Sequence, residues 1–106
     1  MSFKFDFCIT LTNNEGREDP VFQDAVSADR EDDLLQSELA EKWQKAVAMS
    51  DVRADDGTDW DVQVTCTCVT EPGTGVTDWQ DDTMPQRDEV TTYLNEALRR
   101  MAPANA

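Results

Sequence analysis

The side chains that could do chemistry in this chain are 23 carboxylates and three thiols, and there is no histidine. Histidine is the commonest general base and a frequent metal ligand, so the usual member of a catalytic site is missing. The sequence carries no Gly-x-Ser-x-Gly nucleophile motif and no phosphate-binding Walker loop. Gly73-Thr74-Gly75 is a short Gly-x-Gly inside a turn, where glycine is expected anyway. We therefore predict that the protein is not an enzyme and has no catalytic residue and no cofactor.

Two groups of residues have types suited to metal binding, and both lack a full ligand set. Asp55-Asp56-Gly57 could belong to a calcium loop with Gly57 in its sixth position. Three ligand positions of that loop then fall on residues without a carboxylate: Val52, Ala54 and Gln63. Cys66 and Cys68 could form half of a zinc site, but Cys8 is the one other thiol and four ligands are needed. We predict no metal site and, from the odd number of cysteines, reduced and unpaired thiols.

Acidity is the most informative feature of the composition. The 23 Asp and Glu residues against 9 Lys and Arg give a net charge of −14, about one negative charge for every eight residues. Such a surface repels nucleic acid and anionic membranes and attracts basic proteins. One acidic run opens a predicted helix, where the macrodipole favours acids whatever the function: Asp29, Glu31, Asp32 and Asp33. Two further runs lack that local reason: Asp51, Asp55, Asp56, Asp59 and Asp61, and then Asp78, Asp81 and Asp82 with Asp88 and Glu89 behind them.

The candidate partner-binding residues come from these last two runs. They are Asp55, Asp56, Asp59, Asp61, Asp78, Trp79, Asp81 and Asp82. Carboxylates along a strand edge and its loops can match the charge density of duplex DNA, about one phosphate per 1.7 Å of axis. Two interpretations of Trp79 stay open. It is either an exposed anchor, since Trp is enriched at interface hot spots, or a core residue behind a short strand.

Alternating residues predict the strands. Residues 2–12 place Phe3, Phe5, Phe7, Ile9 and Leu11 on one face, and residues 60–70 place Trp60, Val62, Val64, Cys66 and Cys68 on one face. The Asn13-Asn14-Glu15-Gly16 segment predicts a hairpin turn between the first strand and residues 20–27. We expect a returning strand at residues 20–27, although a short helix fits almost as well. Residues 76–79 could add a short edge strand.

Two amphipathic helices complete the prediction. Residues 29–49 form the first, capped by Asp29 and ended by Ser50-Asp51. The second begins at Thr83, with Gln86 as its capping-box partner. Its apolar stripe is Val90, Leu94, Ala97, Leu98 and Met101.

The predicted fold is a single α+β domain over residues 1–106, with a C-terminus that frays from about residue 102. Its architecture is a two-layer sandwich. A mostly antiparallel sheet of three to four strands carries the two helices on one face, in the order β-β-α-β-(β)-α. There is no run of eighteen apolar residues, and charges interrupt the apolar residues at the start of the chain. We therefore expect a cytoplasmic protein, in the host cytoplasm if it is viral.

By size, acidity and lack of motifs, the chain is similar to phage inhibitors of host defence that imitate nucleic acid, such as anti-CRISPR or antirestriction proteins. That likeness implies a small, non-catalytic binding protein that blocks a basic, nucleic-acid-binding surface on a larger protein. The expected partner is that basic surface, with no direct contact to nucleic acid or membrane. One alternative is a structural or assembly subunit that self-associates as a homo-oligomer. Another is a salt-adapted housekeeping domain whose acidity serves solubility.

Overall fold

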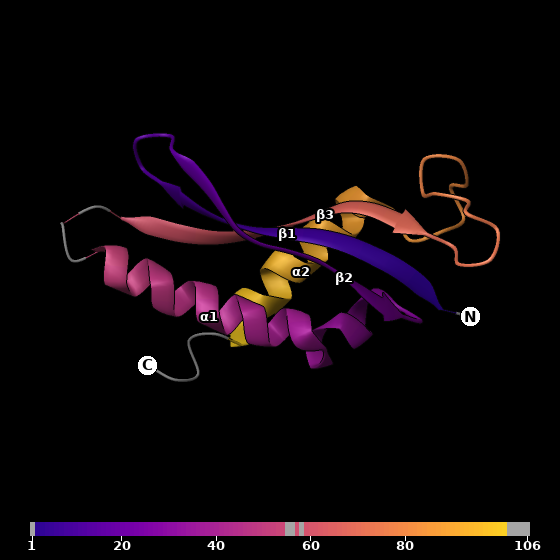
Figure 1. The fold of residues 1–106 in the computed structure, drawn as a ribbon, viewed down its shortest axis with the longest axis horizontal. Coiled ribbons are helices and arrows are strands. Elements are labelled where there is room, and N and C mark those ends of the chain that lie inside the picture. Colours follow the sequence, from indigo (N-terminus) through magenta and orange to yellow (C-terminus); the bar gives the residue numbers. More distant parts are fainter. Residues whose placement is uncertain (1, 55–56, 58, 102–106) are drawn as a thin grey trace.

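Figure 1 shows the fold in the computed structural model, which describes residues 2–54, 57 and 59–101. The elements in chain order are β1 (Phe3–Asn13), β2 (Glu18–Ala28), the 3-10 helix η1 (Glu31–Gln36), α1 (Glu38–Arg53), β3 (Trp60–Thr70) and α2 (Arg87–Met101). The strands form an antiparallel sheet in the order β2-β1-β3. The predicted small α+β fold is confirmed. The predictions for Asp55, Asp56, the side chain of Met101 and the residues from 102 onward lie outside the described residues.

The central strand β1 follows its sequence pattern. Its side chains at Phe5, Phe7, Ile9 and Leu11 are buried, while the residues between them lie on the open face of the sheet. The hairpin to β2 is closed by Asn13, whose side-chain oxygen accepts the backbone N–H groups of Glu15 and Arg17. Gly16 completes the turn at a φ of 86°, a conformation that favours glycine. The strand interpretation of residues 20–27 is confirmed.

A β-bulge in β3 changes which of its cysteines faces the core. Cys66 pairs with Phe7 and Cys68 pairs with Asp6, so Thr67 is an extra residue between the two pairs. The bulge reverses the alternation from that point. Val69 is buried opposite Phe5, and Cys68 lies with Asp6 on the open face. The prediction that Cys68 faces the core was therefore wrong, because period two holds only while the pairing has no bulge.

The first helical segment is divided at Ser37. The Ser37 hydroxyl donates to the carbonyl of Leu34 at 2.6 Å and accepts the N–H of Leu39 at 3.2 Å. It thereby ends η1 and caps α1, as serine favours at a helix start. The predicted cap at Asp29 was wrong, because η1 begins after Arg30 without a side-chain cap. The predicted end at Ser50-Asp51 was also too early, since α1 continues to Arg53.

Both helices pack into one core against the sheet. Leu39, Trp43 and Ala46 of α1 and Val90, Leu94 and Leu98 of α2 are buried with the apolar face of the sheet. In Figure 1, α1 runs below the sheet roughly along its strands, and α2 crosses it obliquely. The helix prediction at Thr83 was four residues early, because α2 begins at Arg87. Residues 76–79 form no strand; they contribute a single bridge between Thr70 and Thr77.

Side chains of α2 occupy the outer edge of β3. Asn95 accepts the N–H of Val64 through Oδ1 at 3.0 Å and donates through Nδ2 to the Val64 carbonyl at 2.8 Å. The Thr91 hydroxyl accepts the N–H of Cys66 at 2.8 Å. These contacts supply the hydrogen bonds that a fourth strand would make. They protect this edge from pairing with another chain.

Candidate protein-binding site

The segment of residues 71–86, here called the Trp79 loop, connects β3 to α2 at one end of the sheet (Figure 1). Its anchor is Asp78, which is 2% exposed. The Asp78 carboxylate accepts the N–H of Val69 at 3.2 Å and the N–H of Arg87, the first residue of α2, at 3.2 Å. A carboxylate is favoured at a helix start because the first backbone N–H groups have no partner within the helix. Asp78 therefore joins the end of β3 to the start of α2.

A second turn fixes the remainder of the Trp79 loop. The Asp81 carboxylate accepts both the N–H and the hydroxyl of Thr83, at 2.9 and 2.6 Å. These hydrogen bonds lower the pKa of Asp81, so its carboxylate stays ionised further into the acid range. The Met84 side chain that follows is buried in the core. Gln86 donates to the carbonyls of Asp81 and Met84 and closes the segment onto α2.

Trp79 projects from this fixed loop and is 59% exposed. The guanidinium carbon of Arg87 lies 5.2 Å from the centre of its ring, within the range of a cation–π contact. The same Arg87 has its Nε 3.7 Å from the Asp78 carboxylate, so its charge is partly compensated. The exposed interpretation of Trp79 is therefore the correct one. A large apolar side chain is held in place with its ring accessible to a partner.

The surroundings of Trp79 are acidic. Residues 71–89 contain six acids and one base, a net charge of −5: Glu71, Asp78, Asp81, Asp82, Asp88 and Glu89 against Arg87. Asp82, three residues after the tryptophan, is exposed, and Asp81 is half-buried. Asp78 was predicted as a partner-binding acid, but its carboxylate is buried and bonded to backbone N–H groups, so it is not exposed to a partner.

The second acidic run lies at the opposite end of β3. Asp59 and Asp61 border a surface hollow of about 260 Å³ together with Trp60 and the β1–β2 turn. Asp61 lies 3.2 Å from Arg99 of α2, and Arg53 stacks on Trp60 at 4.9 Å while pairing with Asp19. Arginines thus compensate part of the charge at this end. Eleven strand residues span roughly 35 Å, so the two candidate clusters do not form one continuous surface.

The first acidic run, on and before η1, lies near α2. Burial raises the pKa of Tyr93, and the negative charges of Asp32 and Glu31 raise it further. The contact between η1 and α2 therefore places these acids near an α2 side chain.

The thiols are differently accessible, which gives a direct test of the bulge. Cys66 is buried, and burial raises its pKa to about 12, whereas Cys8 and Cys68 are half-buried on the open face. Because the thiolate is the reactive form, we expect Cys8 and Cys68 to react with a chromogenic disulfide reagent in the folded protein. Cys66 should react only after unfolding in guanidinium. Equal labelling of Cys66 and Cys68 in the folded protein, measured by peptide mass spectrometry, would contradict the bulged register.

Within the described residues, no three Cys, Asp or Glu side chains are grouped so that they could hold a metal ion. No described helix is long and apolar enough to cross a membrane. No protein-family model, curated protein or solved structure matches this chain. The fold and the candidate site therefore have to be interpreted from their own geometry.

Proposed function

We propose that this chain is a small, non-catalytic binding protein that blocks a basic, nucleic-acid-binding surface on a larger protein. The Trp79 loop is its main contact. The observation that carries the proposal is the combination of an exposed Trp79 with a hydrogen-bonded loop that carries uncompensated carboxylates. A loop that is already ordered loses little conformational entropy on binding, and a rigid aromatic side chain is a typical interface anchor.

The charges provide the second support. A net charge of −14 steers the chain toward basic surfaces and away from nucleic acid. Asp82 and the acids at the start of α2 would pair with Lys and Arg side chains that otherwise hold phosphates. Asp78 has a different role in this proposal, since it holds the loop in shape and does not meet the partner. The finer form of the proposal is a phage inhibitor of host defence, of the anti-CRISPR or antirestriction kind.

The decisive experiment measures competition with nucleic acid. A purified CRISPR effector complex and a purified restriction enzyme are each loaded with fluorescein-labelled duplex DNA, and the chain is added at low and moderate salt. We expect displacement of the duplex from at least one of them, and weaker displacement at the higher salt, because salt screens exposed charges. Capture from lysate of the source cells, followed by mass spectrometry, supplies further candidate proteins for the same assay.

Trp79→Ala is expected to weaken that displacement by roughly 30-fold or more, the effect of removing an interface hot spot. The matched control is Val52→Ala, which removes another exposed apolar side chain, 69% exposed and far along the chain at the end of α1. It should leave displacement unchanged. Asp82→Asn should weaken displacement with little loss of stability, because an exposed carboxylate contributes little to folding. If Trp79→Ala and Asp82→Asn are both neutral for every captured protein, the acidity serves solubility and the proposal is wrong.

A further inference from the structure

The face of the sheet that the helices leave uncovered has a different character from the rest of this acidic chain. Cross-strand partners point to the same face, so the pairing places fifteen residues there, five from each strand. They are Lys4, Asp6, Cys8, Thr10 and Thr12 of β1; Glu18, Pro20, Gln23, Ala25 and Ser27 of β2; and Asp61, Gln63, Thr65, Cys68 and Thr70 of β3. One base and three acids give this face a net charge of −2 out of −14 for the whole chain. It offers a basic partner little to bind.

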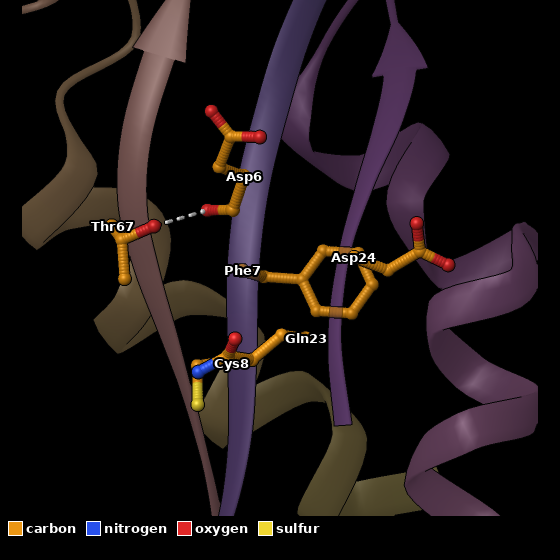
Figure 2. Close-up of a pocket in the computed structure, with 6 residues that line it drawn as sticks. All are labelled: Asp6, Phe7, Cys8, Gln23, Asp24 and Thr67. Carbon is orange, nitrogen blue, oxygen red and sulfur yellow. Dashed lines mark hydrogen bonds between the residues drawn. The ribbon is translucent and has the colours of Figure 1, made fainter. Parts of the chain in front are cut away.

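The few charges on this open face are separated by position. Lys4 lies at one end, 3.9 Å from Asp6. Glu18 and Asp61 lie at the other end, on either side of Thr12. The two rows of paired residues between Asp6 and Thr12 hold only Thr, Cys, Gln and Pro. Around the middle of the face is a hollow of about 380 Å³ lined by Asp6, Phe7, Cys8, Gln23, Asp24 and Thr67, which Figure 2 shows. In that view the Asp24 carboxylate points toward α1, where it pairs with Lys42, so it adds no charge to the open face.

This arrangement suits a second copy of the same chain, and it selects one orientation. Two copies stacked face to face are related by a twofold axis that runs either along the strands or across them. An axis along β1 would place Lys4 over Lys4, Asp6 over Asp6, and Glu18 over Asp61, which sets like charges opposite each other. An axis across the strands reverses the strand direction of the second copy. Each Lys4 then lies over Thr12 of the other copy. The two acids that flank Thr12, Glu18 and Asp61, lie one strand away on either side.

The register of the reversed stack follows from the same residues. With the axis through Cys8, Asp6 lies over Thr10, Glu18 over Ser27, and Asp61 over Thr70, so every acid meets an uncharged residue. Moving the axis one pair along the strand, to Asp6, would place the two Asp6 carboxylates together. Moving it to Thr10 would leave Lys4 and Asp6 beyond the end of the other copy. The Cys8-centred register is therefore the one in which all five rows of the open face overlap without opposed like charges.

We propose that two copies of this chain pair through their open sheet faces, antiparallel and centred on Cys8. Three strands about 4.8 Å apart and eleven residues long present roughly 500 Å² per copy, or about 1,000 Å² in total. That area is at the lower limit for specific interfaces, so we expect a weak dimer. The edge of β2 is a poorer route to self-association, because it carries Pro20 and the acids of β2, which discourage edge pairing.

The first test is cross-linking with a short bifunctional thiol reagent, read by denaturing electrophoresis and peptide mass spectrometry. Cross-linked dimer is expected from the wild type and from Cys66→Ser and Cys68→Ser, and the yield should be lost in Cys8→Ser. All four proteins are compared by circular dichroism to verify the fold. A yield that survives in Cys8→Ser and is lost in Cys68→Ser would overturn the Cys8-centred arrangement.

The second test follows the monomer–dimer equilibrium by sedimentation. Dimer should increase with added salt, because salt screens the repulsion between two chains of charge −14; a complex with a basic partner should instead weaken with salt. Thr65→Asp places an acid over its own copy and should raise the dissociation constant at least about tenfold. Lys4→Glu should also weaken the dimer, and Lys45→Glu on the exposed face of α1 is its control with the same net charge. A monomer at every concentration in high salt, or equal effects of the two lysine variants, would overturn the proposal.

Discussion

Replacing Asp78 with Ala is expected to lower the free energy of unfolding by about 2–4 kcal/mol. The variant removes the acceptor for two backbone N–H groups, those of Val69 and Arg87. Val69 is fully buried, so its N–H has no access to water once the carboxylate is gone. Each buried donor left without a partner costs about 1–3 kcal/mol. The start of α2 also loses the negative charge that favours its N-terminus. Urea denaturation followed by circular dichroism measures the change.

Two variants make this result specific to the buried carboxylate. Asp82→Ala removes an exposed acid four residues further on and should change stability by about 0.5 kcal/mol or less. Asp78→Asn keeps one side-chain oxygen as an acceptor, so its free energy of unfolding should lie between those of Asp82→Ala and Asp78→Ala. If Asp78→Ala were as stable as Asp82→Ala, the carboxylate would not be holding the loop, and the anchor assigned to it would have to be abandoned.

The strands of this fold can be predicted from the sequence because their alternation is strong. Phe5, Phe7, Ile9 and Leu11 are buried where period two places them, and the turn at Asn13 and Gly16 closes the hairpin as expected. Two amphipathic stripes were enough to predict helices that cover one face. These features depend on residues close in sequence. Hydrophobic periodicity therefore determines the class of fold here.

Features that depend on contacts between distant residues could not be predicted in the same way. The bulge at Thr67 exists because β3 pairs with β1 in a shifted register beyond Cys66, and no residue in residues 60–70 signals that shift.

The break at Ser37 was a local choice between two arrangements. A serine inside an apolar helical pattern can either continue the helix or cap a new one, and here its hydroxyl bonds to both segments.

Part of the geometry of the candidate site could be predicted from the sequence. Acids around Trp79 indicated the loop, but a run of acids does not reveal which carboxylate is buried. Asp78 is distinguished by the backbone N–H groups of Val69 and Arg87, nine residues before and after it. Arg87 was missed as part of the site. Its signal was a lone base among six acids in residues 71–89, a position that favours ion pairing and stacking on the tryptophan.

The second large effect is expected at Asn95, whose side chain bonds to both backbone groups of Val64. Val64 is fully buried, so Asn95→Ala leaves an N–H and a carbonyl without partners and should lower the free energy of unfolding by about 2–4 kcal/mol. Asn95→Asp keeps the acceptor for the Val64 N–H but loses the donor to the Val64 carbonyl. Its free energy of unfolding should lie between those of the wild type and Asn95→Ala. Glu96→Ala, at the neighbouring exposed position of α2, is the control and should change stability by about 0.5 kcal/mol or less.

Asn95→Ala should also change how the protein behaves in solution, because the outer edge of β3 becomes available for pairing. Exposed strand edges template association with other chains, so this variant should aggregate at concentrations where Glu96→Ala does not. Amide hydrogen exchange gives the residue-level measurement. The Val64 amide should exchange faster in Asn95→Ala than the loss of global stability explains, while that of Leu11 in the centre of the sheet should follow the global change. If the exchange rates of both amides increased in parallel, Asn95 would contribute only to overall stability. Its assigned role as a substitute for a fourth strand at the edge of β3 would then be refuted.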